Sequence, residues 1–378
     1  MLRRPACPSL MGIFRSHSLC LSTSATRNAS NRAVVFTENG NPAEVLRVQS
    51  YDPPPQPPSD SVHVRFRLSP INPSDINVVQ GVYPAKPMQM QLSGEDVFVG
   101  GNEGLAEVTD IGSGVKGLEK GDWVVSAKAQ VGSWSSSRVL RAEDVIKLPA
   151  GELSEVNAAT ITVNPATAYN MLRDFVDLKE GDWVLQNGGN SAVGQAVIQI
   201  AARMGIKTIN FVRNRPDFDG LISQLTQLGA THVFKYDALS DKSLAKHVKQ
   251  WTSSSPIRLM LNCVGGPDTT AMTRLLGDNA HLVSYGAMSK KPLPLPTSAF
   301  IFKNLSAQGF WQSRWYNQHT RKEREDLMKT LAGFKLKEPE HEILDLSGEP
   351  SDETATQKLR EVLTRMEQGF GKKVLLRL

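Results

Sequence analysis

One stretch restricts the possible folds more than any other part of the chain. It runs from Gln186 to Asp217 and reads QNGGNSAVGQAVIQIAARMGIKTINFVRNRPD. A glycine-containing loop leads into residues whose apolar positions recur with helical spacing, and Gly205 stands where that helix should end. A second β-like segment, KTINFV, follows, so the order predicts a strand-helix-strand unit with parallel strands. The apolar face expected to pack on the sheet consists of Val193, Ala196, Val197, Ile200, Ala201 and Met204.

The loop resembles the dinucleotide-binding fingerprint G-x-G-x-x-G with one substitution. It fits the pattern only as Gly189, Ser191 and Gly194, so a serine stands where the second glycine is expected. In such loops the three glycines allow, in order, the tight turn, close approach to the pyrophosphate, and packing of helix on strand. The serine side chain must therefore point away from the phosphates or donate a hydrogen bond to one. In both cases the helix N-terminus still offers N–H groups to an anion.

The residues after KTINFV discriminate between two nicotinamide cofactors. NAD sites usually carry an acid about 20 residues after the glycine loop, which binds the ribose 2′-hydroxyl, whereas arginine accommodates a 2′-phosphate. Here Arg213, Asn214 and Arg215 follow the strand, and the first acid is Asp217. Guanidinium groups bind phosphate through charge-assisted hydrogen bonds. Two solvated arginines at a strand end are the simpler alternative, but the βαβ context favours an NADPH site.

The remaining sequence predicts a second, mainly β domain that is interrupted by the first. Between 62 and 148, short β-like runs are separated by Gly, Asp and Ser, whereas from about 158 strands alternate with helices. After about 321 the chain predicts a charged helix, a strand in EHEIL, a second helix and a last strand in KKVLLRL. We therefore predict an α/β protein: a Rossmann domain with a doubly wound parallel sheet at 158–320, and a β domain made of 32–157 and 321–378.

The first 31 residues contain four arginines and many serines but no Asp or Glu, a composition typical of a mitochondrial transit peptide. An unstructured tail is the simpler alternative. Removing these arginines from the formal net charge of +5 leaves about +1, so the basic composition requires no nucleic-acid partner. No run of 18 apolar residues occurs, so we expect no transmembrane helix. The three cysteines are too few for a disulfide framework, and Cys263 is expected to end a buried strand.

Several segments together resemble a known enzyme family. They are NPSDINVVQGVY, VNPATAYNML, KEGDWVLQNGGNSAVGQAVIQIA, LNCVGG and FKNLSAQGFW. They resemble the medium-chain dehydrogenase/reductase superfamily and, more closely, its mitochondrial trans-2-enoyl-CoA (enoyl thioester) reductases. The resemblance covers nearly the whole chain after residue 31 and implies a GroES-like catalytic domain beside the Rossmann domain. Zinc-dependent members need cysteine ligands, and no cysteine lies between Cys20 and Cys263, so we expect no metal.

The resemblance also implies functional residues. Tyr83 matches the family's proposed proton donor, and a phenol is protonated at neutral pH; the alternative is a loop tyrosine that packs before Pro84. Asn164 matches an asparagine beside the nicotinamide, and it can also cap the helix expected at Pro165. Lys372 matches a lysine near the cofactor, although the neighbouring Lys373 leaves that register open.

The other residues implied by the resemblance surround the cofactor. Phe310, Trp311 and Trp315 are expected to wall an acyl-chain cavity or, equally, to pack in the core. The full set comprises Asn190, Ser191, Ala192 and Val193 at the pyrophosphate, Arg213, Asn214 and Arg215 at the 2′-phosphate, and Tyr285, Gly286, Ala287, Met288, Phe310, Trp311, Gln312 and Ser313 at the nicotinamide end and acyl pocket.

The implied function is NADPH-dependent reduction of trans-2-enoyl groups carried by acyl carrier protein or CoA, in mitochondrial fatty acid synthesis, by a homodimer in the matrix. Hydride would go to Cβ and a proton to Cα. Two alternatives remain open: a zinc-free NADPH quinone reductase of the same superfamily, and an NADPH-binding scaffold or regulator without turnover. Residues 84–99 form a longer segment than the family leads us to expect, and they either reshape the entrance or bulge into solvent.

Overall fold

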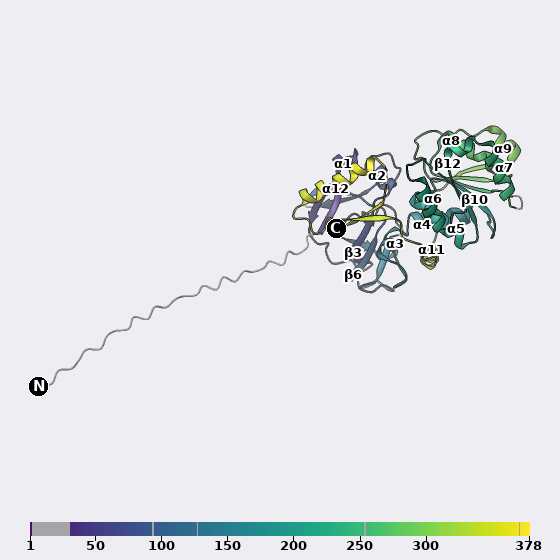
Figure 1. Ribbon diagram of the computed structural model, residues 1–378. Helices are drawn as coiled ribbons and strands as arrows, with labels where there is room; N and C mark the ends of the chain where they lie inside the picture. The colour runs from purple at the N-terminus through teal and green to yellow at the C-terminus, as the bar shows by residue number, and fades with distance from the viewer. Residues whose placement is uncertain (2–30, 93, 127, 253–254, 370) are drawn as a thin grey trace.

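The computed structural model describes residues 1, 31–92, 94–126, 128–252, 255–369 and 371–378. Apart from its two end residues, the predicted transit peptide lies outside the described residues. The described chain forms two lobes, one containing two β-sheets and the other a six-stranded sheet covered by helices (Figure 1). Among the helices described, none has the length and apolar character needed to cross a membrane.

The six-stranded sheet is parallel throughout and has the order β12-β11-β10-β13-β14-β15. The chain enters at β10, builds one side of the sheet, and then returns to build the other. This order confirms the predicted doubly wound α/β fold and creates a switch point between β10 and β13, where ligands bind in such sheets. The strands are β10 (Trp183–Asn187), β11 (Lys207–Val212), β12 (His232–Lys235), β13 (Leu259–Asn262), β14 (His281–Ser284) and β15 (Ser306–Gly309).

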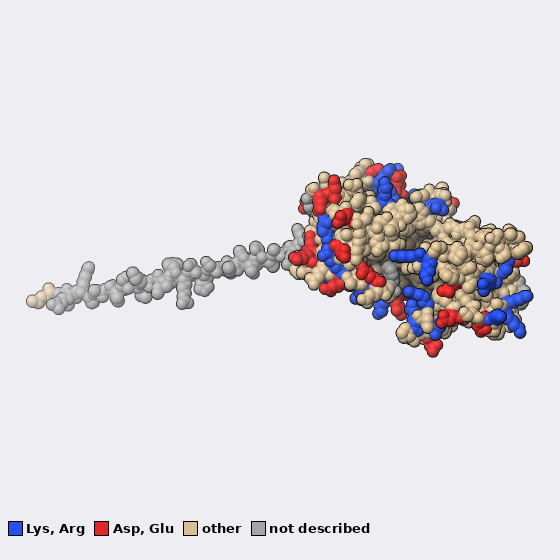
Figure 2. All heavy atoms as spheres, turned by 90° about the horizontal axis from the view of Figure 1, so that it is seen from above, with Lys and Arg blue, Asp and Glu red and all other residues tan. Residues whose placement is uncertain are grey.

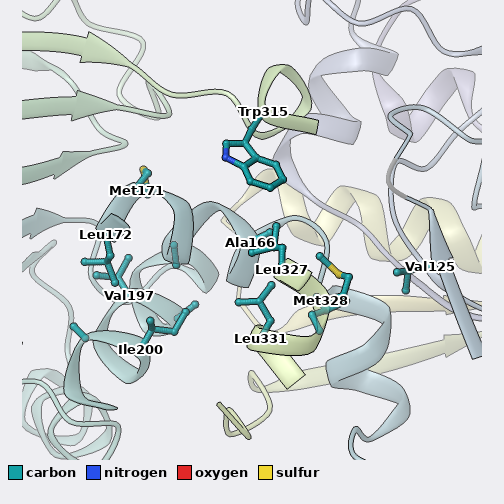
Figure 3. Close-up of a cluster of buried hydrophobic side chains, with 14 of the residues drawn as sticks. Val125, Ala166, Met171, Leu172, Val197, Ile200, Trp315, Leu327, Met328 and Leu331 are labelled. Atoms are coloured by element: carbon teal, nitrogen blue, oxygen red, sulfur yellow. The ribbon is translucent and has the colours of Figure 1, made fainter. Parts of the chain in front are cut away.

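Helix α5 (Ala192–Arg203) follows β10, and the positive φ of Gly205, +70°, takes the chain out of it, as predicted. Its apolar face packs with helices α4 (Asn164–Asp174) and α11 (Arg321–Gly333) in one buried cluster (Figure 3). The cluster extends to Val125 in the β lobe, so the two lobes share a continuous core. Each fully buried aliphatic side chain of this kind stabilises the fold by about 1.5–3 kcal/mol.

Further helices belong to this lobe, and those of them that Figure 1 labels surround the parallel sheet. They are α6 (Phe218–Gln227), α7 (Lys242–Trp251), α8 (Gly266–Met272), α9 (Thr297–Lys303) and α10 (Gln312–Gln318).

The larger sheet of the β lobe combines strands from both ends of the chain. Its order is β16-β17-β3-β6-β7-β9, with β8 paired to β3. The predicted boundary at 157/158 falls within α3 (Glu155–Thr160), which packs on β3 and β6; the domain limits remain predictions. The strands are β3 (Ser61–Pro70), β6 (Leu105–Ile111), β7 (Trp123–Ser126), β8 (Ser137–Arg141), β9 (Val145–Lys147), β16 (His341–Asp345) and β17 (Lys373–Arg377).

The long segment 84–99 is neither a bulge into solvent nor an irregular loop. Most of it forms the antiparallel hairpin of β4 (Met88–Leu92) and β5 (Glu95–Val99). Together with β1 (Asn31–Phe36) and β2 (Arg47–Tyr51), this hairpin makes a four-stranded sheet of order β2-β1-β5-β4. The helices of this lobe are α1 (Pro42–Val45), α2 (Pro73–Val79) and α12 (Asp352–Glu367).

Candidate active site

The glycine loop turns sharply where β10 ends, at the switch point of the sheet. Gly188 has a φ of +59°, and a Cβ atom there would lie 2.6 Å from Sγ of Cys263. A Cβ atom on Gly194 would lie 2.5 Å from the carbonyl oxygen of Gly188. The carbonyl oxygen of Gly188 accepts a 2.8 Å hydrogen bond from the N–H of Ser191, so the tight turn begins at Gly188 and has Gly189 and Asn190 at its centre. Cys263 follows the buried strand β13 and is itself buried, as expected.

Ser191 is the N-cap of α5. Its Oγ accepts a hydrogen bond of 3.1 Å from the N–H of Gly194, so the oxygen satisfies one of the open donors at the helix start. Ala192 and Val193 form the next two positions, where backbone N–H groups have no acceptor within the helix. The loop thus keeps an anion-binding helix terminus although it lacks the middle glycine.

Arg213, Asn214 and Arg215 are exposed directly after β11. The first acid, Asp217, caps α6 by accepting a 3.0 Å hydrogen bond from the N–H of Gly220. Tyr236 lies between Arg213 and the glycine turn. Its hydroxyl accepts a 3.3 Å hydrogen bond from the N–H of Gly188. Burial raises the pKa of Tyr236 to about 12, and Arg213 is close enough to oppose that shift.

The next two strands of the sheet deliver the other predicted cofactor residues to the same edge. The N–H of Tyr285 donates a 2.9 Å hydrogen bond to the backbone carbonyl of Asn262. The N–H of Phe310 donates a 2.9 Å hydrogen bond to the backbone carbonyl of Ser284. Gly286 packs against Cys263, where a Cβ atom would meet Cys263 at 3.2 Å. These contacts follow from parallel pairing, because the carboxyl ends of parallel strands lie along one edge.

Two further predicted residues of this set differ in burial. Met288 is 56% exposed, whereas Gln312 is buried and its Oε1 accepts a 3.1 Å hydrogen bond from Asn170. Trp315 is a core residue: its ring lies in the shared hydrophobic cluster and its Nε1 donates to Asp174 over 3.1 Å (Figure 3).

Tyr83 joins the β lobe to the end of the parallel sheet. Its hydroxyl oxygen accepts a 2.8 Å hydrogen bond from Nε1 of Trp311, and the two rings meet edge to face with centroids 6.1 Å apart. Burial raises the pKa of Tyr83, the hydrogen bond from Trp311 lowers it, and the charge of Asp75 raises it. The phenol is therefore held in its protonated form.

A buried polar cluster lies between the lobes with Asn72 at its centre, and of its members only Asn164 belongs to the predicted set. The Nδ2 of Asn164 donates to Oδ1 of Asn72 over 3.4 Å, and Nζ of Lys373 donates to the same oxygen. The Nδ2 of Asn72 donates to Oε1 of Glu103 over 2.7 Å, and its backbone N–H donates to Oδ2 of Asp75 over 2.8 Å. Asn164 is thus connected to three titratable groups through Asn72.

The cluster contains Lys373 and not Lys372. Lys372 is exposed, whereas Lys373, the first residue of β17, turns inward and is partly buried. Neighbouring residues of a strand point to opposite faces, so only one of the two can reach the site. Sequence did contain one usable signal: Asn72-Pro73 and Asn164-Pro165 both place an asparagine before a proline at a helix start.

Burial dominates the titration of the cluster. It raises the pKa of Asp75 from an ordinary 3.8 to about 7, and it raises the pKa of Glu103. Burial lowers the pKa of Lys373, and Glu103 and Asp75 oppose that shift. Groups whose protonation is this sensitive to their surroundings mark functional sites more often than ordinary surface charges do.

The surface is hollowed between the two lobes, and basic side chains lie beside the hollow (Figure 2). Within the residues that the structure describes, no group of three or more His, Cys, Asp or Glu side chains is arranged to hold a metal ion.

Two family models match the chain. One is the alcohol dehydrogenase GroES-like domain, which matches residues 58–150. The other is described as zinc-binding dehydrogenase and matches residues 192–332.

Similar solved structures share the whole architecture. A complex of Etr1p with NADP and crotonyl-CoA superimposes with a TM-score of 0.85 at 34% identity, covering 92% of this chain and 100% of that one. The mitochondrial 2-enoyl thioester reductase Etr1p/Etr2p heterodimer from Candida tropicalis gives a TM-score of 0.84 at 34% identity, with the same coverage. A quinone oxidoreductase from Pseudomonas syringae, at 22% identity and a TM-score of 0.71, shares the fold.

Curated relatives match over most of their length. The mitochondrial enoyl-[acyl-carrier-protein] reductase of Yarrowia lipolytica is 42% identical over 353 residues, 92% of each chain. The human protein of the same name is 43% identical over 300 residues, 79% of this chain and 77% of its own. The chain therefore belongs to the mitochondrial enoyl-[acyl-carrier-protein] reductases, a family with the medium-chain dehydrogenase/reductase fold.

Proposed function

We propose that this protein reduces the C2–C3 double bond of trans-2-enoyl thioesters with NADPH as the hydride donor, and that Tyr83 supplies the proton. The observation that carries the proposal is the hydrogen bond between Tyr83 of the β lobe and Trp311 of the cofactor lobe. This hydrogen bond supports the proposal because Trp311 follows β15 at the carboxyl edge of the parallel sheet, where a dinucleotide binds in this fold, and the Tyr83 hydroxyl carries a proton.

The residues present fit NADPH. The turn at Gly188 and the close packing at Gly194 leave the start of α5 free of side chains that would block a pyrophosphate. Ala192 and Val193 would offer backbone N–H groups to it, and Arg213 and Arg215 would bind the 2′-phosphate. When bound, NADPH supplies the hydride.

The chain's own residues must manage the charge and the proton. Hydride addition at Cβ leaves an enolate on the thioester, which needs hydrogen-bond donors and then a proton at Cα. An indole N–H can only donate, so Trp311 does not use the hydroxyl hydrogen of Tyr83. That hydrogen is free for the substrate, while the Trp311 hydrogen bond stabilises the phenolate left behind. Asn164, at the start of α4, would orient the carboxamide of the nicotinamide or an oxygen of the substrate.

NADPH oxidation with crotonyl-CoA and longer trans-2-enoyl-CoA substrates tests the proposal. Tyr83→Phe should lower kcat by about 10²- to 10⁴-fold, the usual contribution of a positioned acid. Tyr169→Phe, in a tyrosine of α4 whose ring packs on Phe334, is the matched control and should keep the wild-type rate. Oxidation of NADPH by a 1,4-benzoquinone, with none by any enoyl-CoA, would support a quinone reductase instead.

The names of the relatives support a proposal for the carrier and the compartment. We propose that the enoyl group is attached to acyl carrier protein or CoA, and that the protein works in mitochondrial fatty acid synthesis in the matrix. A comparison of KM for the same acyl chain on the two carriers decides between them. Localisation of the full-length chain, and of a variant that lacks residues 2–30, tests the predicted transit peptide.

We further propose that two copies of this chain associate through the edge of the parallel sheet. Strand β15 is the last strand on its side of the sheet, and strands with an unpaired edge readily pair with another chain. The adjacent helix α9 exposes Phe300, Ile301 and Phe302, at 40%, 66% and 79%. An apolar patch of this kind marks an interface. Ile301→Glu with Phe302→Glu should therefore yield monomers in sedimentation velocity, whereas Ile343→Glu on β16, 41% exposed in the wild type, should not.

A further inference from the structure

The hydrogen bonds around Glu103 fix its protonation state. Its Oε1 accepts from Nδ2 of Asn72 over 2.7 Å, and its Oε2 accepts from the backbone N–H of Val163 over 3.0 Å and from the hydroxyl of Thr162 over 3.2 Å. The side-chain amide of Asn72 cannot be flipped, because its Oδ1 accepts hydrogen bonds from Lys373 and Asn164. A carboxyl group surrounded by donors accepts at both oxygens, so Glu103 is ionised.

Asp75 has a different pattern. Its Oδ2 accepts a 2.8 Å hydrogen bond from the backbone N–H of Asn72, and the backbone N–H of Asn102 also faces the carboxylate. Its Oδ1 is buried without a hydrogen-bond partner among the described residues, and the whole residue is 2% exposed. Oδ2 thus accepts a hydrogen bond, whereas Oδ1 has no partner within hydrogen-bond distance among the described residues. A proton bound at Oδ1 therefore displaces no hydrogen bond.

The charges of the cluster lead to the same assignment. Glu103 and Lys373 compensate each other, so an ionised Asp75 would leave one negative charge in a buried site, which is costly. Asp75 from α2, Glu103 from the loop before β6 and Lys373 from β17 act on one another through their charges. The charge of Asp75 also acts on Tyr83, in the segment after α2, and that of Glu103 acts on Tyr316 of α10.

We propose that Asp75 is the neutral, proton-bearing member of this cluster and that it is a positioning residue for the reduction, acting through the charge that Tyr83 experiences. While Asp75 keeps its proton, the cluster carries no net charge and Tyr83 can release its own proton to the substrate. When Asp75 ionises, a buried negative charge opposes formation of the Tyr83 phenolate. The kinetic part of this inference rests on the proposed function of Tyr83.

The rate of proton transfer should therefore decrease with pH. Burial raises the pKa of Asp75 to about 7, so its charge appears within the range where enzymes are assayed. Under single-turnover conditions with NADPH and crotonyl-CoA, the wild-type rate should decrease several-fold from pH 6 to pH 8.5, because the charge of Asp75 raises the pKa of Tyr83 and a weaker acid transfers its proton more slowly. In Asp75→Asn, which mimics the neutral carboxyl group, the rate should stay constant over the same pH range.

Infrared difference spectroscopy tests the protonation state without turnover. The wild-type minus Asp75→Asn spectrum at pH 6 should contain the C=O stretch of a protonated carboxyl group, and this band should vanish by pH 8.5. If Asp75→Asn does not fold, incorporation of ¹³C-carboxyl aspartate into the wild-type protein must shift the same band. Absence of a protonated aspartate band at pH 6 would overturn the proposal.

The two parts of the experiment separate the two ideas. A wild-type protein that reduces no enoyl-CoA but shows the Asp75 band defeats the proposed function and leaves the protonation assignment standing. An active enzyme whose pH dependence is identical in wild type and Asp75→Asn defeats the positioning role alone. Asp110→Asn, at a surface aspartate paired with Lys120, is the matched control and should retain the wild-type pH dependence.

Discussion

The glycine loop and the Asn72 cluster lie in the same site but are built in opposite ways. The loop comprises residues 188–194, and its contribution is a backbone shape: a turn, a cap and open N–H groups. The cluster draws Asp75, Glu103, Asn164 and Lys373 from four separate segments, and its contribution is a balance of charge. A ligand site made from backbone can be identified in the sequence, whereas a site made from compensating charges becomes visible only after folding.

Glu103→Ala should give the largest effect and tests whether the cluster depends on charge balance. The change leaves the Lys373 cation without its main counter-charge in a buried site, so the free energy of unfolding should decrease by about 3–5 kcal/mol. Chemical denaturation measures it. Glu107→Ala, which removes a partly exposed ion pair with Arg67, is the control and should cost less than about 1 kcal/mol. Similar losses in both variants would show that the cluster behaves like surface charge.

Asp75→Asn should alter the pH dependence of stability. The pKa of Asp75 is raised from 3.8 to about 7 on folding, so between these values the folded state binds more protons than the unfolded state. Wild-type stability due to this residue is therefore fully present below the unfolded pKa and is lost as pH rises through about 7. The free energy of unfolding of Asp75→Asn minus that of the wild type should therefore increase by on the order of 2–4 kcal/mol between pH 4 and pH 8. A difference that does not change with pH would contradict the raised pKa.

The double variant Arg213→Ala with Arg215→Ala tests the loop side of the comparison. Charge-assisted hydrogen bonds contribute about 1.5–3 kcal/mol each, so the Kd of NADPH should rise at least roughly tenfold while that of NADH stays the same. Fluorescence titration of both cofactors measures the ratio. Arg203→Ala, at the far end of α5, is the control. Equal weakening of NADPH and NADH would exclude these arginines as the 2′-phosphate site.

Ser191→Ala should have the smallest effect. Loss of an N-cap oxygen usually costs about 1 kcal/mol, whereas glycine at the same position costs only a few tenths. Thermal unfolding of Ser191→Ala and Ser191→Gly should rank them in that order. If Ser191→Gly is the less stable protein, position 191 does not behave as an N-cap.

Sequence predicted those parts of the fold that depend on local periodicity. The strand-helix-strand unit and its glycine at 205 are confirmed, because hydrophobic spacing and helix-ending residues operate over a few positions. The β4–β5 hairpin was not predicted, since its strands are recognised only once β5 pairs with β1 and β4 pairs with β5. The choice between Lys372 and Lys373 depended on the register of β17 against β3, and a shift of one residue exchanges the two faces of a strand.

Strand β17 also governs the order in which the protein can fold. It lies between β16 and β3, and Lys373 contacts Asn72, 301 positions earlier in the chain. Such distant pairing is slow, because a large loop must close before any contact is gained. The six parallel strands, in contrast, lie within 183–309 and can pair without waiting for the chain ends. We therefore expect a folding intermediate with a formed nucleotide-binding sheet and an open β lobe, in which amide protons of β10 gain hydrogen-exchange protection before those of β3.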